Sequence, residues 1–206
     1  MSAVPALAGF DHFLLAALNA LVGRSWLLDS LIALSLDNPV AKAGPIGACF
    51  LYAWFRAGGG PDEAARRRVL AVALLSLFLI APVSKAMSEG WTSPRPFVQA
   101  QPAYVLRDGG VAEAPPLEIR IISTGELAGR AEALRAGRLE ANDLGGFPSD
   151  HAALYFALSL GILLACRAAG IVALLWTALT IFAVRVAVGL HWASDIVAGA
   201  LLGAAI

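Results

Sequence analysis

Charged residues are scarce in this chain of 206 residues, making up 15% of it, and basic and acidic side chains balance at 15 each. This balance gives no support to nucleic-acid binding or to a polybasic surface for anionic membranes. Hydrophobic residues instead reach 59% and the mean hydropathy is +0.73, which is unlike an ordinary soluble domain. The composition therefore predicts a membrane protein.

Cysteine and histidine are also rare, with two and three residues respectively. Cys49 and Cys166 lie within or at the end of apolar runs and lack the spacing of a metal site or a CxxC pair, so we expect them to pack as small apolar residues. We predict no metal site and no cofactor. The segment Met1 to Gly9 lacks the positive region of a secretory signal, so we interpret the whole chain as mature.

Long apolar runs predict the helices that cross the bilayer, because a helix needs about 20 mostly apolar residues to span about 30 Å of hydrocarbon. The last run stops at Ile206 after about 11 to 15 residues, which is short for a crossing and is consistent with a few absent C-terminal residues. Its Gly199 and Gly203 form a GxxxG pattern that either allows close helix contact or is incidental in so alanine-rich a chain. The apolar runs are Val40–Phe55, Val69–Met87, Ala152–Cys166, Ile171–Leu190 and Ile196 onward.

The N-terminal segment Phe10 to Leu36 is apolar but interrupted by Asn19, Arg24 and Asp29, which are costly at a bilayer centre unless paired. It either spans the membrane or lies in the interface. We therefore expect an all-α, polytopic membrane helical bundle of five or six spanning helices. Residues 1–206 would form a single domain, with 1–38 as an interfacial or first helix.

Basic residues predict the orientation of the bundle. Arginines crowd the connection that contains Arg56 and Arg66 to Arg68, and Arg167 lies in the next connection on the same side, which the positive-inside rule assigns to the cytoplasm. The opposite, extracytoplasmic side carries a loop over residues 97–147. A capping box at Ser123 to Glu126 predicts a short helix there, through about Ala141. The loop is either a packed surface insertion, with Leu127, Ala131 and Leu134 along one stripe, or a lid that selects substrate.

Side chains suited to catalysis collect at helix ends that parity places on the extracytoplasmic face. On a continuous helix His191 and Asp195 stand four residues apart, so the carboxylate can accept a proton from one imidazole nitrogen and leave the other as a nucleophile or base. Ser149 can cap a helix whose first N–H groups favour an anion. The candidate residues are Lys85, Arg95, Ser149, Asp150, His151, Arg185, His191 and Asp195.

The cations of this group predict the ligand. If Lys85, Arg95 and Arg185 converge, they carry three positive charges and several donors, enough to neutralise a phosphate or diphosphate headgroup. The remaining polar residues are interpreted as structural, with His12 in the interface and Lys42 as a snorkelling side chain. The sequence therefore predicts a phosphorylated lipid as the substrate.

These residues resemble the three signature motifs of the type-2 phosphatidic acid phosphatase superfamily, the integral-membrane lipid phosphatases. The motifs are Lys85 with Arg95-Pro96, then Pro148-Ser149-Asp150-His151, then Arg185-x5-His191-x3-Asp195. Their order, with that of the apolar runs, fits from Val40 to Ile206. Asp150 stands where most members have glycine. An aspartate at this position is similar to the bacitracin-resistance branch, which removes a phosphate from undecaprenyl diphosphate. The segment Phe10 to Leu36 also resembles that branch.

Two positions depart from the family pattern. Nine residues separate Lys85 from Arg95 where the family usually has six, and Ser88 occupies the usual lysine position. Three extra residues are nearly one helical turn, about 4.5 Å, so Lys85 stays near the same face but further from the phosphate. In the third motif Val184 stands where the family commonly has serine.

The resemblance implies a metal-independent hydrolase of the cytoplasmic membrane. His191 would attack phosphorus to give a phosphohistidine, with Asp195 holding its tautomer, and His151 would protonate the leaving oxygen. Lys85, Arg95, Ser149 and Arg185, with backbone N–H groups near Asp150, would hold the phosphoryl oxygens.

Three other functions remain open. A phosphohistidine could pass its phosphoryl group to a hydroxyl acceptor, which would make the protein a lipid phosphotransferase. Phosphatidylglycerol phosphate or phosphatidate could replace undecaprenyl diphosphate as substrate. An inert lipid-binding or transport scaffold could keep the basic pocket without turnover, although it has no need of two histidines and Asp195.

Overall fold

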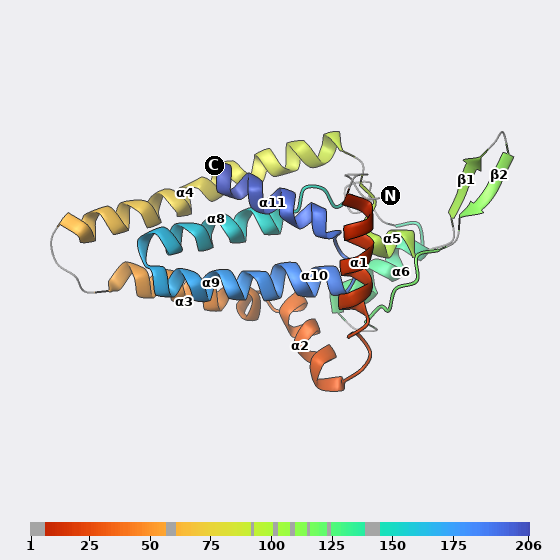
Figure 1. The fold of residues 1–206 in the computed structure, drawn as a ribbon, viewed down its shortest axis with the longest axis horizontal. Coiled ribbons are helices and arrows are strands. Elements are labelled where there is room, and N and C mark those ends of the chain that lie inside the picture. Colours follow the sequence, from red (N-terminus) through yellow and green to blue (C-terminus); the bar gives the residue numbers. More distant parts are fainter. Residues whose placement is uncertain are drawn as a thin grey trace.

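The protein is seen in a computed structural model that describes residues 7–56, 61–91, 93–100, 103–107, 110–114, 116–122, 125–138 and 145–206. It is an all-α bundle of membrane-protein type, and this confirms the fold class expected from the sequence (Figure 1). In the described part of the chain, the continuous helices Asp62–Gly90 and Arg167–Ala187 are long and apolar enough to cross a bilayer. Shorter apolar helices cover Asp150–Ala165 and Ala193–Ala205.

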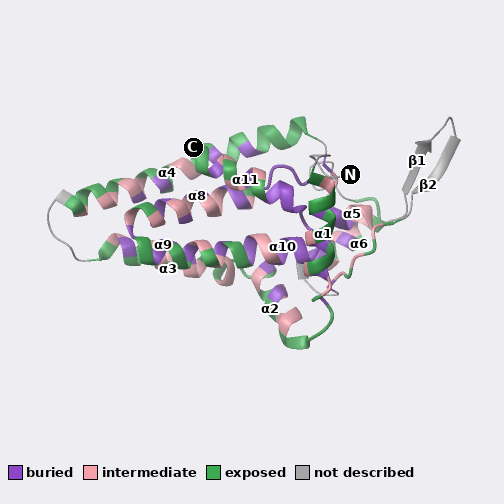
Figure 2. Cartoon of the chain, in the orientation of Figure 1, coloured by how far each residue is buried: buried purple, intermediate pink, exposed green. Residues whose placement is uncertain are grey.

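The bundle is built around α8 (Asp150–Ala165), which packs against α4 (Pro61–Gly90), α9 (Arg167–Thr177) and α11 (Ala193–Ala205). Buried residues line the facing sides of these helices (Figure 2). Small residues make the close approaches possible, because a β-carbon on Gly203 would overlap the carbonyl oxygen of Ala153, and one on Gly199 would overlap that of Ser149. The GxxxG pattern is therefore a helix-packing face and not incidental.

One long helix ends beside the residues of the third motif. It runs through α9, a π-helical stretch η2 (Ala178–Ala183) and α10 (Val184–Ala187) without interruption. The sequence places its end at Leu190, but the helix stops at Ala187 because Gly189 adopts a left-handed φ of 73°. The chain then turns into α11.

The N-terminal segment forms two helices where the sequence allowed one. These are α1 (Ala8–Asn19) and α2 (Trp26–Asp37), separated by a turn in which Gly23 has a φ of 76°. Twelve residues make a helix of about 18 Å, which is shorter than the hydrocarbon core. Helix α1 lies across the end of the bundle, where Figure 1 shows it perpendicular to the long helices.

Asn19, which is costly in an apolar segment, is buried with all of its hydrogen-bonding groups in use. Its amide nitrogen donates to the carbonyl oxygens of Ala187 at 2.7 Å and Arg120 at 2.9 Å. Its oxygen accepts from the backbone N–H of Arg120 at 2.8 Å. This side chain therefore ties α1 both to the end of α10 and to the long loop.

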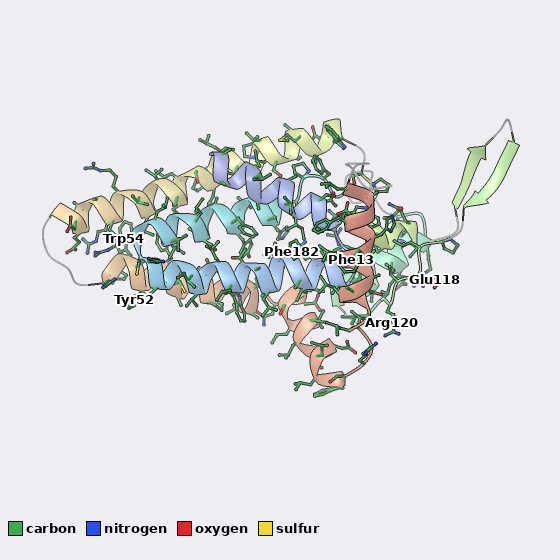
Figure 3. All side chains as sticks on the ribbon, viewed as in Figure 1. Phe13, Tyr52, Trp54, Glu118, Arg120 and Phe182 are labelled. Atoms are coloured by element: carbon green, nitrogen blue, oxygen red, sulfur yellow. The ribbon has the colours of Figure 1, made fainter. Side chains whose placement is uncertain are left out.

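The opposite end of the bundle carries the basic connection. There the Nε of Arg66 donates to the carbonyl oxygen of Ala53 at 2.9 Å, which satisfies the last turn of α3 (Pro39–Phe55). Figure 3 shows Tyr52 and Trp54 at this end and Phe13, Glu118 and Arg120 at the other. Aromatic and basic residues are typical of a membrane interface.

The loop expected over 97–147 carries a short helix, as predicted, and also a hairpin that the sequence reasoning did not foresee. The short helix α5 (Pro96–Gln99) precedes an antiparallel pair, β1 (Ala103–Arg107) and β2 (Gly110–Ala114). Helix α6 (Gly125–Arg135) follows and ends before the expected Ala141, since Gly137 takes a left-handed φ of 66°. Ser123 of the predicted capping box lies outside the described residues.

Helix α6 packs on the end of the bundle. Leu127 and Ala131 are buried, and Leu134 lies against the same apolar cluster, which also contains Phe97 and Leu190. The predicted apolar stripe is therefore confirmed as a packing face. Because Leu190 precedes His191, the loop helix supports the segment in which the third motif lies.

Candidate active site

A cavity of about 260 Å³ opens at the end of the bundle where α4 ends and α8 begins. Four of the predicted site residues line it, and they come from three separate stretches of sequence: Lys85, Arg95, Asp150 and His191. Gly145, Gly146, Ser84 and Ser88 complete the polar part of the lining. Segments that are far apart in the sequence therefore meet at one cavity.

His191 stands in the turn between α10 and α11 and is buried. The turn is held because Gly189 accepts a hydrogen bond from the N–H of Phe97 at 2.9 Å, and the N–H of Leu190 donates to the carbonyl oxygen of Arg185 at 2.9 Å. Gly189 has a left-handed φ of 73°, which favours glycine, and a β-carbon there would also require the terminal methyl group of Ile119 to shift. These contacts fix the backbone of the turn that carries His191.

The neighbours of His191 determine which nitrogen carries the proton. Nδ1 lies 3.0 Å from the carbonyl oxygen of Gly146, which can only accept. Nε2 lies 3.1 Å from a guanidinium nitrogen of Arg95 and 3.5 Å from one of Arg185, which can only donate. Nδ1 is therefore the N–H donor, and Nε2 presents its lone pair to the two guanidinium groups.

Burial and positive charge keep this imidazole neutral. Loss of solvent lowers the pKa of His191 well below 6.5, and the charges of Arg95 and Arg185 lower it further. A neutral imidazole whose lone pair faces two cations is suited to attack an anionic phosphoryl group, because the cations would bind the phosphoryl oxygens.

Asp195 lies beside His191 without a direct hydrogen bond to it. Its Oδ2 is 3.7 Å from Nδ1 of His191 and accepts from the backbone N–H of Trp192 at 3.0 Å, which caps α11. The orienting partner of Nδ1 in this structure is the Gly146 carbonyl. A β-carbon at Gly146 would lie 2.7 Å from Oδ2 of Asp195 and 3.4 Å from Nδ1 of His191, so glycine leaves room for both groups.

Arg95 is held in the site by two backbone carbonyl groups. Its Nε donates to the carbonyl oxygen of Gly145 at 2.8 Å, and its terminal nitrogen donates to that of Leu190 at 3.0 Å. Burial, followed by the charges of Arg130 and Arg185, lowers the pKa of Arg95 to about 10, so it remains protonated at neutral pH. Arg185 is also buried, and Lys85 is exposed at the mouth of the cavity.

The second motif is joined to the third at the start of α8. The N–H of Ser149 donates to the carbonyl oxygen of Asp195 at 3.0 Å, and its Oγ accepts from the N–H of Ala152 at 3.4 Å, which makes it the N-cap as predicted. His151 follows, and its positive charge when protonated is one of the contributions that lower the pKa of His191. Both histidines are therefore at the same end of the bundle.

Asp150 has a contact that the sequence reasoning did not anticipate. Its carboxylate lies 2.9 Å from Nδ1 of His151 and also accepts from the backbone N–H of His151 at 2.7 Å. The carboxylate is therefore positioned to orient an imidazole, whereas the prediction gave this position a part in phosphate binding through backbone N–H groups. Nε2 of His151 is left as the nitrogen that can exchange a proton with a substrate.

Two further groups were missed by sequence reasoning. The Gly146 carbonyl could not have been found, because a backbone acceptor has no sequence signature. Asp11 did carry a signal, since an acid inside an apolar segment needs a partner. It is buried in α1, where its two oxygens accept from the N–H and hydroxyl of Ser194 at 2.8 and 2.6 Å. It thus secures the first turn of α11 beside Asp195.

Within the described ranges, no group of three or more histidine, cysteine, aspartate or glutamate side chains is arranged to hold a metal ion. Cys49 and Cys166 both pack in or against an apolar cluster between α3 and α9, as their sequence context predicted.

Comparison with known proteins shows the family to which the sequence is similar. A family model described as the PAP2 superfamily covers residues 68–206, which include all of the site residues named from the sequence. No curated protein and no solved structure matches the chain significantly.

Proposed function

We propose a reaction for this chain, which belongs to the PAP2 superfamily and is a membrane protein with phosphatase activity. The protein hydrolyses a lipid diphosphate through a phosphohistidine on Nε2 of His191. The observation that carries this proposal is the contact of Nε2 with two guanidinium groups at 3.1 and 3.5 Å. A lone pair opposed by two cations is the arrangement expected before a phosphate dianion takes its place between them.

The first step transfers the phosphoryl group to the protein. The lone pair of Nε2 forms a bond to phosphorus while the bond from phosphorus to the bridging oxygen breaks, and His151 donates a proton to that oxygen. Negative charge on the equatorial oxygens is neutralised by Arg95 and Arg185, and Lys85 and Ser149 add donors. Nδ1 of His191 keeps its proton, because the Gly146 carbonyl and the nearby Asp195 stabilise the resulting imidazolium.

The second step hydrolyses the phosphohistidine and regenerates free His191. Water attacks phosphorus as His151 takes up a proton from it, the bond between phosphorus and Nε2 breaks, and inorganic phosphate leaves. His151 thus ends the cycle protonated, ready to donate again. Asp150, at 2.9 Å from Nδ1 of His151, holds the ring with Nε2 free for this proton transfer. No step of this cycle requires a metal ion.

The substrate proposed is undecaprenyl diphosphate, hydrolysed at the extracytoplasmic face of the cytoplasmic membrane. The sequence supports this choice because the aspartate at position 150 is similar to the motif of the bacitracin-resistance branch of the family. The arginine-rich connection at the opposite end of the bundle supports the orientation, because basic residues favour the cytoplasmic side. Hydrolysis there would recycle a carrier lipid used in cell-wall synthesis.

The experiment is a phosphate-release panel in detergent with excess chelator, using undecaprenyl diphosphate, phosphatidic acid and phosphatidylglycerol phosphate. The diphosphate should give the highest kcat/KM. His191→Ala should abolish release while Arg24→Ala, a charge change away from the cavity lining, should not. Rapid quench with labelled substrate should trap an acid-labile, alkali-stable label on the wild type only. A strict requirement for magnesium, or hydrolysis by His191→Ala, would refute the mechanism.

A further inference from the structure

The side of the cavity formed by α4 contains a hydroxyl group that the family motifs do not assign. Ser84 is 1% exposed and lines the cavity together with Lys85, Arg95 and His191. Its Oγ has no hydrogen-bond partner among the residues that the structure describes. A buried hydroxyl without a partner is destabilising, so its presence at a cavity needs an explanation.

Other serines of the same helix satisfy their hydroxyl groups locally. Ser76 donates to the carbonyl oxygen of Ala73 at 2.9 Å, and Ser88 donates to that of Lys85 at 2.8 Å. Such bonds to a carbonyl of the preceding turn are the usual solution for serine inside a helix. Ser84 departs from this behaviour, and it lies on the part of α4 that lines the cavity of His191.

The altered first motif offers a reason for the unpaired hydroxyl of Ser84. Ser88 stands where the family usually has lysine, and its hydroxyl is already engaged with the backbone. Lys85 lies three residues earlier and is exposed, so its charge reaches the cavity from the mouth. Of the two serines of α4 that line the cavity, Ser84 is the one whose hydroxyl has no partner among the described residues.

Resting on the proposed function, we propose that Ser84 is a further ligand of the substrate headgroup and donates its hydroxyl proton to a phosphoryl oxygen. The donor set on this wall is then one ammonium group and one hydroxyl group, in place of the single lysine of the usual motif. In the absence of substrate the hydroxyl stays unpaired and destabilises the protein, and binding of the anion satisfies it.

The proposal predicts that Ser84→Ala changes stability and activity in different ways. Removing an unpaired buried hydroxyl should leave the melting temperature of the free protein equal to or higher than that of the wild type. Removing a hydrogen bond to an anion should lower kcat/KM at least tenfold, since such bonds contribute about 1.5 to 3 kcal/mol. Ser76→Ala is the matched control, because Ser76 lies two turns away on the same helix and outside this cavity. It should leave kcat/KM unchanged.

A binding measurement keeps this test independent of turnover. Orthovanadate, as a phosphate analogue, should raise the melting temperature of the wild type and of Ser76→Ala, and should do so less for Ser84→Ala at equal concentration. If the wild type hydrolyses no lipid phosphate, the proposed function fails, but the vanadate comparison still decides whether Ser84 binds the anion. Equal vanadate shifts in wild type and Ser84→Ala, or equal kcat/KM values, would overturn the assignment.

Discussion

The contact between α8 and α11 holds the second and third motifs together, and Gly199 is the residue that permits it. A β-carbon at Gly199 would lie inside the 3.0 Å that real β-carbons essentially never show, and the atom it would meet is the backbone carbonyl oxygen of Ser149. Backbone cannot rotate away as a side chain can. In Gly199→Ala the two helices must therefore separate by about 1 Å to restore van der Waals contact.

The consequences for stability and activity can be worked out separately. Overpacking of this kind costs about 1 to 3 kcal/mol of unfolding free energy. Ser149 precedes His151 by two residues and bonds to the backbone of Asp195, so the same displacement moves one histidine relative to the other. A 1 Å misplacement of reacting groups lowers the rate by about 100-fold. We therefore expect kcat to fall by about that factor while some folded protein remains.

Gly203→Ala is the matched control for this prediction. Its β-carbon would meet the carbonyl oxygen of Ala153 in the same way, but one helical turn further from the cavity. The melting temperatures of both variants should fall by similar amounts, whereas phosphate release, measured well below those temperatures, should fall much more in Gly199→Ala. Wild-type kcat in Gly199→Ala, or an equal loss of kcat in Gly203→Ala, would refute the reasoning.

Two further predictions concern Asp11 and the pKa of His191. Asp11→Ala removes both acceptors of Ser194, so kcat should drop by about tenfold or more with little change in KM. Asp11→Asn should recover part of this loss. The control is Asp29→Asn, because the carboxylate of Asp29 binds the N–H of Gly23 in the N-terminal turn. A change in KM alone for Asp11→Ala would show that the contact does not position the catalytic turn. Because burial and two arginines hold the pKa of His191 well below 6.5, the imidazole stays neutral as the pH falls past 6.5. The acid limb of kcat/KM against pH should have its midpoint well below that value, and a midpoint at or above 6.5 would contradict the argument.

Periodicity and apolar length predicted most of the bundle, because the hydrocarbon core imposes the same length on each crossing helix. The segment Phe10 to Leu36 was less determined, since apolar composition does not distinguish one spanning helix from two short ones. The break at Gly23, with its left-handed φ, settles the number of helices. The hairpin of β1 and β2 was missed although the sequence carries a signal for it, since Asp108-Gly109 stands between two short runs that contain Tyr104, Val105 and Val111.

For the site, the residue types were readable from the sequence and their relations were not. His191 and Asp195 stand four residues apart, which suggested a direct hydrogen bond along a helix. The helix begins only at Ala193, so His191 lies in the preceding turn and its Nδ1 bonds to Gly146 instead. Asp150 likewise contacts the adjacent imidazole of His151. Both outcomes depend on local backbone geometry, which spacing alone does not specify.

The sequence by itself determined that this is a membrane helical protein with cations and histidines at helix ends, because composition and motif spacing are properties of the chain alone. Only the tertiary structure decided which nitrogen of His191 faces the cations, which serine of α4 has no partner among the described residues, and how Asp11 supports α11. Those features depend on contacts between segments up to 183 residues apart, and the close approach of backbones at glycine makes such contacts possible.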